Sequence, residues 1–185
     1  MRTKVFALLV ALMASVSVMA QQQEERQLTK QEIKALQDRI DSALNVEAEN
    51  AIRDSMFTLE AHQVVFKYGQ TAYVTSHTNF IAVKKSDAVV QVAFNVPFAG
   101  QNGLGGVTVS GTISQYRITK DRKGNTNVTM NVSGVGISAQ LLITLWGGTN
   151  EATVTVMPNF NSNRITLTGV ILPSEKSDVF QGITF

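Results

Sequence analysis

The side chains that could hold a metal ion are few and scattered along the chain. The sequence has two histidines, His62 and His77, and no cysteine. A structural zinc site needs four ligands and a catalytic one three, so carboxylates would have to complete either kind. Beyond residue 60 the acids stand singly in or beside predicted turns, at Asp87, Asp121, Glu151, Glu175 and Asp178. We therefore interpret both histidines as polar residues at strand edges and expect neither a metal nor a cofactor.

The sequence carries no signature of hydrolase chemistry. No G-x-S-x-G segment marks a nucleophilic serine. The composition permits a Ser-His-Asp triad, but no spacing marks one. Glycoside cleavage needs two carboxylates at neighbouring inward positions, whereas these acids are isolated. We predict no catalytic residues and expect that the protein is not an enzyme.

The most unusual segment is the glycine-rich stretch 97–106, PFAGQNGLGG. Phosphate-binding loops of this kind lie between a strand and a helix, but residues 107–110 have the pattern of a strand. The glycines favour a tight crossing or a bulge of the chain. The alternative is a lip beside a ligand groove. The candidate ligand-binding residues in such a lip are Phe98, Gly103, Gly105 and Gly106.

Trp146 is the single tryptophan and stands directly before Gly147 and Gly148. A tryptophan next to a turn is typical of an anchor in the core or at its rim, with the indole N–H reaching a partner. A flat platform for a ligand is the alternative. Trp146 is therefore the remaining candidate ligand-binding residue.

The first 20 residues have the pattern of a secretory signal peptide. Arg2 and Lys4 precede the apolar stretch 5–18, and Ala20 stands before the polar run that begins at Gln21. Without cysteine after the predicted cleavage site, we expect an exported protein in the periplasm or outer envelope that is not a lipoprotein. No later stretch reaches the roughly 20 apolar residues of a spanning helix, so we expect no transmembrane segment.

The charged residues argue against a nucleic-acid partner and divide the chain into an acidic part and a basic part. Without Arg2 and Lys4, the 185-residue chain has 14 basic and 14 acidic residues, so we expect no nucleic-acid partner. Residues 21–60 carry nine acidic and five basic residues, and residues 61–185 carry five acidic and nine basic. This acidic first part disfavours binding to anionic lipid.

Residues 21–55 have the pattern of a charged helical arm. Thr29 followed by Glu32 predicts a capping box at the start of a helix. The next apolar residues recur on one stripe at helical spacing, at Ile33, Leu36, Ile40 and Leu44. So narrow an amphipathic helix needs a surface to cover. We expect the arm either to pack on its own domain or to pair with a second copy of the chain.

Residues 56–185 change to short alternating runs rich in Val, Ile, Thr and Phe, which predict strands. The predicted strands are 56–62, 80–85, 88–94, 107–110, 113–119, 126–133, 139–146, 152–157 and 165–171. Ser86 and Asp87 predict a tight hairpin. The fold class is mainly β, an antiparallel meander of about 8–10 strands after an N-terminal amphipathic helix. Periodicity leaves open whether the sheet forms a partly closed barrel or a two-layer sandwich; we favour a curved, partly closed sheet whose edge or open end the arm covers.

Several segments resemble an exported Bacteroidetes family catalogued as domain of unknown function 4251. The resemblance spans most of residues 50–172 and includes, besides the glycine-rich stretch, residues 57–61, 79–83, 88–92 and 111–116. It implies an envelope setting and an antiparallel β domain, and it implies no activity. If the source is such a bacterium, Asp41-Ser42-Ala43 and Asp54-Ser55-Met56 resemble its O-glycosylation pattern. Ser42 and Ser55 are then candidate glycosylation sites.

Three functions from different classes remain open. The first is a non-enzymatic exported β domain that binds a protein or an envelope component. The second is a calycin-like carrier of a small apolar ligand, which requires a cavity of several hundred Å³ lined by strand side chains. The third is a hydrolase, which requires His62 or His77 close to a pocket.

Overall fold

The computed structural model describes residues 28–93, 106–159 and 164–182. The predicted signal peptide and three candidate residues, Phe98, Gly103 and Gly105, lie outside the described residues. The chain divides into two units, Met1–Gln37 and Asp38–Phe185, each with its own internal contacts. Within the described residues, no helix combines the length and apolar character needed to cross a bilayer.

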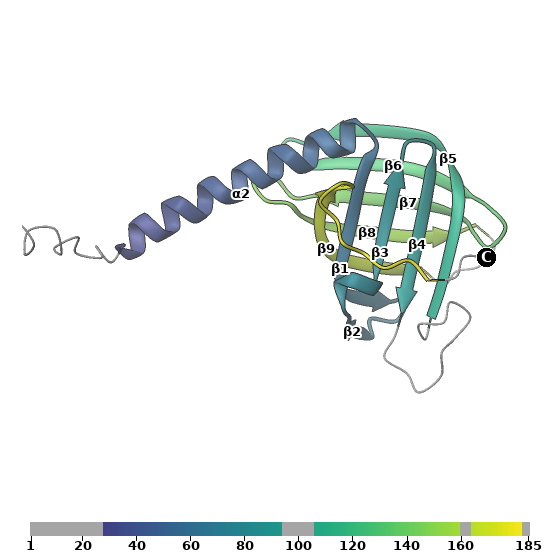
Figure 1. Cartoon of the computed structure of the whole chain (residues 1–185). Coiled ribbons are helices and arrows are strands. Elements are labelled where there is room, and N and C mark those ends of the chain that lie inside the picture. Colours follow the sequence, from purple (N-terminus) through teal and green to yellow (C-terminus); the bar gives the residue numbers. More distant parts are fainter. Residues whose placement is uncertain (1–27, 94–105, 160–163, 183–185) are drawn as a thin grey trace, which may run out of the picture. The chain divides into compact units, whose positions relative to one another are not determined.

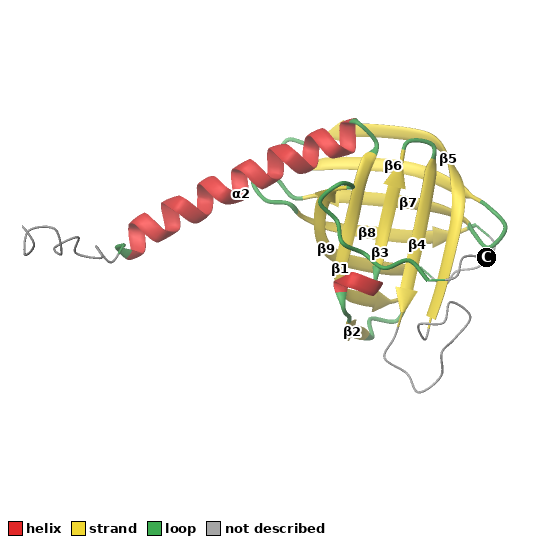
Figure 2. Cartoon of the chain, in the orientation of Figure 1, coloured by secondary structure: helices red, strands yellow, loops and turns green. Residues whose placement is uncertain are grey.

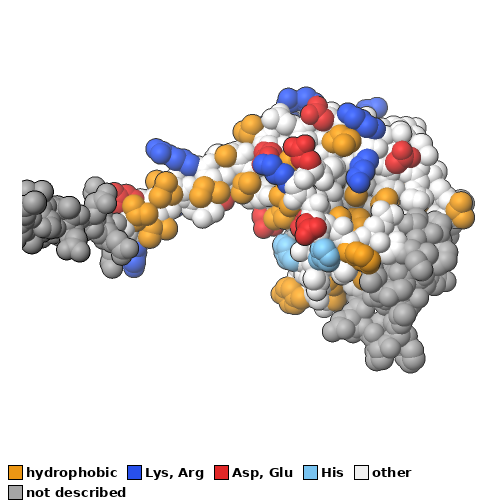
Figure 3. Space-filling view, in the orientation of Figure 1, with side chains coloured by type: hydrophobic (Ala, Val, Ile, Leu, Met, Phe, Trp, Pro, Cys, Tyr) orange, Lys and Arg blue, Asp and Glu red, His pale blue; other side chains and the backbone are white. Residues whose placement is uncertain are grey.

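The arm contains one long helix, α2 (Lys30–Arg53), which begins at the predicted capping box. The Glu32 N–H donates to Thr29 Oγ1 at 3.2 Å, and the Thr29 N–H donates to Glu32 Oε2 at 2.9 Å. These two bonds satisfy backbone donors that a helix start leaves without partners. Apolar side chains form a row along the helix (Figure 3).

The β domain is a closed antiparallel barrel of eight strands with one extra strand (Figures 1 and 2). Its strands are β1 (Met56–Phe66), β2 (Thr71–Tyr73), β3 (Phe80–Lys84), β4 (Asp87–Ala93), β5 (Gly106–Lys120), β6 (Thr126–Ser133), β7 (Ser138–Leu145), β8 (Glu151–Pro158) and β9 (Ile165–Pro173). Pairing follows chain order from β3 to β9, and β1 lies between β3 and β9, which closes the ring. The short β2 pairs only with β1. The predicted mainly-β meander is confirmed, and it forms a barrel, not a sandwich.

Two local predictions differ from the structure. The predicted strands 107–110 and 113–119 are one strand, β5, with a register shift between Ser114 and Arg117 and a positive φ of 55° at Gln115. A bulge therefore bends β5 where the sequence suggested a break. The hairpin turn also lies one residue earlier than predicted, because Lys84 pairs with Asp87 and Lys85 adopts a φ of 58°.

Alternate residues of β1, β6, β7, β8 and β9 fill the barrel interior, and Val109 and Ile113 of β5 pack partly buried against them. In β6, Val128, Met130 and Val132 are at most 1% exposed, as the alternation of the sequence predicts. The other large, fully buried side chains of this core include Phe57, Leu59, Ile81, Leu141, Ile143, Leu145, Leu167 and Ile171. A side chain that lined a ligand-sized void would expose surface to it, so these layers of the barrel are packed solid.

Residues 174–182 form a C-terminal strap across the outer face of β1, β3 and β4 (Figure 1). Phe80 and Ala82 point outward, because they alternate with the core residue Ile81, yet they are only 1% and 6% exposed. The Phe180 N–H donates to the His77 carbonyl at 2.8 Å. A small hollow of about 120 Å³ remains between strap and sheet. The barrel wall is thus covered on both faces in this region.

Candidate functional site

The C-terminal half of α2 lies against the end of the barrel where β1 begins and where β5, β7 and β9 end. Ala48, Ala51 and Ile52 are at most 6% exposed and belong to the same apolar cluster as the strand side chains. Two of the three are alanines, so the helix backbone approaches the barrel closely. This part of the arm packs on its own domain, which is one of the two arrangements expected from the sequence.

Polar contacts fasten the helix at this end. Glu49 Oε1 accepts hydrogen bonds from Lys120 Nζ at 2.7 Å and from Thr126 Oγ1 at 3.1 Å. The bond from Lys120 holds the pKa of Glu49 below its usual value, against the opposing effect of burial. Asn45 Nδ2 donates to the Trp146 carbonyl at 3.1 Å, in the turn after β7. The three partner residues of α2 lie at or directly beyond strand ends that are distant from it in sequence.

Tyr116 forms a further contact with α2. Its hydroxyl donates to the Ile52 carbonyl at 2.7 Å, one of the last carbonyls of α2. Burial raises the pKa of Tyr116 to about 12, while a hydrogen bond with the Ser55 side chain acts in the opposite direction. The phenol therefore stays protonated and acts as a structural donor at neutral pH.

The chain leaves α2 through a tight reversal into β1. Ser55 adopts a φ of 55°, and its carbonyl accepts the Lys85 N–H at 2.7 Å. Lys85 Nζ also donates to the Asp54 carbonyl at 3.1 Å. The β3–β4 hairpin thus satisfies carbonyls at the helix end that have no partner inside the helix.

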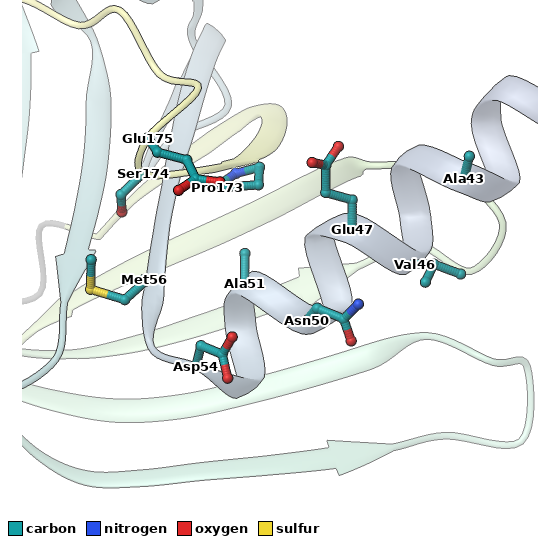
Figure 4. A pocket seen from close by; sticks show the side chains of 10 residues that line it. All are labelled: Ala43, Val46, Glu47, Asn50, Ala51, Asp54, Met56, Pro173, Ser174 and Glu175. Carbon is teal, nitrogen blue, oxygen red and sulfur yellow. The ribbon is translucent and has the colours of Figure 1, made fainter.

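A groove of about 470 Å³ runs between α2 and the segment that follows β9 (Figure 4). We call it the α2 groove. Its lining residues are Ala43, Val46, Glu47, Asn50, Ala51, Asp54, Met56, Pro173, Ser174 and Glu175. Helix residues spaced three and four apart form one wall, and Pro173 to Glu175 form the other. Both walls belong to elements that lie at the same end of the barrel.

Acidic groups dominate the polar part of the α2 groove. Glu47 points from the helix toward the opposite wall (Figure 4) and forms an ion pair with Lys176. The carboxylates of Asp54 and Glu175 have no ion-pair partner among the described residues. The groove therefore offers two unneutralised carboxylates beside the apolar side chains of Val46 and Met56, which is the chemistry of a site for a basic and apolar segment.

Comparison with known proteins identifies the family. The family model for domain of unknown function DUF4251 matches residues 39–171. The chain belongs to the DUF4251 family. A crystal structure of a DUF4251 family protein from Bacteroides eggerthii is similar over 77% of this chain and 96% of that chain, with 48% sequence identity and a TM-score of 0.66. No curated protein matches the chain.

The candidate ligand-binding residues of this DUF4251 chain do not meet in one place among the described residues. Gly106 begins β5, where a Cβ atom would lie 1.9 Å from the Val92 carbonyl oxygen. Close packing of two strands thus accounts for glycine at this position. Trp146 is 45% exposed beside the turn after β7. Its backbone carbonyl, not its ring, accepts the hydrogen bond from Asn45. The role of Trp146 in ligand binding stays a prediction.

The two predicted glycosylation sites of the DUF4251 chain lie in different surroundings. Ser42 is exposed on α2, and its hydroxyl donates to the Asp38 carbonyl at 2.8 Å. Ser55 is half-buried in the reversal after α2. Of the two histidines, His62 is exposed on β1 and His77 stacks on Phe180 at 6.4 Å. Neither histidine lines the α2 groove or the hollow under the strap.

The groove residues do not form a recognisable group in the sequence. Glu47, Asp54 and Glu175 are separated by as many as 128 positions, and only the fold brings them together. One local signal exists: Ala43, Glu47, Asn50 and Asp54 recur at four- and three-residue spacing, which places them on one face of α2. That face becomes recognisable as a groove wall only when the opposite wall is known.

Proposed function

We propose that this chain is an exported, non-enzymatic binding domain that holds a segment of a protein partner in the α2 groove. The observation that carries the proposal is the presence of the Asp54 and Glu175 carboxylates beside apolar side chains such as Met56 in a groove of about 470 Å³. The first 20 residues support export to the periplasm or outer envelope.

The charge of the groove specifies the chemistry of the partner segment. A neutral ligand that covered Asp54 and Glu175 would remove water from both carboxylates without replacing its hydrogen bonds, which is costly. A lysine or arginine side chain would pair with one of them and lay its methylene stem along Met56, which lies at the same end of the groove as Asp54 and Glu175 (Figure 4). The partner segment is therefore apolar and basic.

The geometry gives less support to the two other functions. A carrier needs a cavity inside the barrel, whereas Phe57, Leu141 and Leu167 are fully buried in packed layers of the described core. A hydrolase needs a reactive group beside a pocket, and the described residues contain no group of three or more side chains that could bind a metal. His62 and His77 lie outside both hollows.

Binding of designed peptides tests the groove. The probes are a peptide of alternating leucine and lysine and its leucine–glutamate counterpart, measured by titration calorimetry against the exported chain. We expect the lysine peptide to bind at least about tenfold more tightly, a difference of about 1.4 kcal/mol. Asp54→Asn combined with Glu175→Gln removes that preference. The control is Glu151→Gln, which removes an exposed carboxylate outside the groove.

Equal affinity of the two peptides, or a preference that survives the double substitution, would contradict the proposed site. Location is tested separately, by fractionation of the native host. We expect the chain in the periplasmic or outer-envelope fraction, with Gln21 as its first residue. Recovery of the uncleaved chain from the cytoplasm would rule out export.

A further inference from the structure

One carboxylate of the α2 groove is already paired within the chain itself. Glu47 belongs to the helix wall, and Lys176 directly follows Glu175 of the opposite wall. Their ion pair therefore joins the two walls of the groove. The carboxylates of Asp54 and Glu175, by contrast, form no ion pair within the described part of the chain. Lys176 thus supplies from inside the chain the kind of basic group that we assign to the partner segment.

This ion pair is open to water and can be replaced. The side chains of Lys176 and Glu47 are 56% and 33% exposed. Exposed ion pairs contribute little to stability, because water and salt screen them and because two long side chains must be held in one geometry. The free energy that a basic partner segment has to supply in order to displace Lys176 from Glu47 is correspondingly small.

The wall that carries Lys176 is held by other contacts. The Ser174 N–H donates to the Met56 carbonyl at 3.1 Å, which fastens the wall to the start of β1. Ser177 Oγ donates to Glu60 Oε1 at 2.8 Å, further along the same strand. These bonds lie on both sides of Lys176 in the sequence. Only the Lys176 side chain therefore has to move for its place beside the helix wall to become free.

Two roles of the ion pair predict opposite effects on binding. If Lys176 only holds the walls in place, loss of its charge loosens the groove and weakens the binding of a basic segment. If Lys176 instead competes with the segment for Glu47, loss of its charge adds a third free carboxylate to those of Asp54 and Glu175. Binding of a basic segment then becomes stronger. The contacts of Ser174 and Ser177 favour the second role, because they hold the wall without Lys176.

We propose that Lys176 is an internal competitor for the α2 groove, which pairs with Glu47 in the free chain and is displaced when a partner segment binds. The inference rests on the proposed function and makes the partner more specific. The segment carries at least two basic residues, one for Glu47 and one for the end of the groove with Asp54 and Glu175. A segment with a single basic residue leaves Lys176 in place and binds more weakly.

Titration calorimetry with the leucine–lysine peptide provides the first test. Lys176→Met should bind this peptide about two- to fivefold more tightly than the wild-type chain does, the range expected for release of an exposed ion pair. The matched control is Lys67→Met, at the far end of β1 and roughly 30 Å from Met56 along the strand. It removes the same charge and should leave the affinity unchanged, because salt screens so distant a charge.

A second substitution locates the effect at Glu47. Glu47→Gln in the wild-type background removes a carboxylate that Lys176 already occupies, so the affinity for the peptide should fall little. In the Lys176→Met background the same carboxylate is free to bind the peptide, so Glu47→Gln should cancel the gain. Equal effects of Glu47→Gln in the two backgrounds would show that the two residues act independently and would overturn the inference.

The outcomes separate this inference from the proposed function. An affinity of Lys176→Met equal to or below that of the wild-type chain, or a gain that Lys67→Met matches, overturns the competition and leaves the groove as the peptide site. A melting temperature of Lys176→Met within about 3 °C of wild type shows that its fold is intact. Equal affinity of the wild-type chain for the leucine–lysine and leucine–glutamate peptides contradicts the proposed function itself, and the inference falls with it.

Discussion

Gln91 is the side chain on which the C-terminal strap depends. It lies on the outer face of β4, is completely buried, and uses both ends of its amide. Its Nε2 donates to the carbonyls of Thr78 at 3.0 Å and Phe180 at 2.8 Å. Its Oε1 accepts from Thr108 Oγ1 at 2.7 Å and from the Gly182 N–H at 2.8 Å. Two of the four partners belong to the strap.

Gln91→Leu keeps the volume of the side chain and removes all four bonds. Each bond contributes about 1 kcal/mol net, and the fully buried Thr108 hydroxyl loses its bond to Gln91. Burial of the added apolar surface offsets part of this loss, so we expect destabilisation by about 2–4 kcal/mol. For a domain of this size, that corresponds to a fall in melting temperature of about 5–15 °C.

Hydrogen exchange locates the effect. The amides of Phe180 and Gly182 bond across the strap, so they should exchange faster in Gln91→Leu, while amides of the barrel core such as Met130 should change only through the global loss of stability. The matched control is Gln140→Leu on the outer face of β7, which should change stability by less than about 0.5 kcal/mol. A melting temperature within about 2 °C of wild type, with unchanged strap amides, would refute the reasoning.

Four further substitutions test the barrel and its contact with α2. Tyr116→Phe should lower the free energy of unfolding in urea by about 1 kcal/mol. Because the pKa of the phenol is about 12 in the folded chain, wild-type stability should fall as pH rises from about 10 to 12, and the variant should lack that part of the fall. Glu49→Gln should lower the free energy of unfolding by up to about 1 kcal/mol at pH 7. Because the pKa of Glu49 is lowered in the folded chain, the difference in stability between wild type and this variant should vanish as pH falls below about 4.5. Lys120→Met should remove that difference at every pH. Gly169→Ala should cost about 3 kcal/mol or more, because the added Cβ would lie 1.9 Å from the Glu60 carbonyl oxygen; a cost below about 1 kcal/mol would show that β1 and β9 separate without difficulty.

Local sequence patterns were sufficient to predict much of the fold. The Thr29 and Glu32 pair located the start of α2, and strict alternation located β6 to the residue. The sequence predicts two strands in place of β5, because Gly111 and Thr112 have the composition of a turn. In the structure, glycine is needed at 111 for another reason: a Cβ there would lie 2.7 Å from the Ser133 carbonyl oxygen. Composition alone does not separate a glycine of a turn from one of a close strand contact.

Closure of the barrel and position of the strap depend on contacts that periodicity does not encode. β1 and β9 pair across about a hundred residues, and alternation specifies which face of each strand is buried but not its neighbour. The sequence does contain one indication that the outer face of β3 is covered. Residues 80–83 read Phe-Ile-Ala-Val without alternation, which is typical of a strand buried on both faces. The segment that covers the outer face could not be deduced from that pattern.

The two parts of α2 contribute differently to the molecule, and truncation distinguishes them. Ala48, Ala51 and Ile52 pack on the barrel, while Ile33 and Leu36 remain exposed. A chain that begins at Asp38 should therefore keep its core. The loss of the capping box frays the new helix start, at a cost of about 1 kcal/mol. We therefore expect a melting temperature that falls less than in Gln91→Leu. A collapse of the melting temperature would contradict this division of α2 and would assign residues 30–37 to the stability of the barrel.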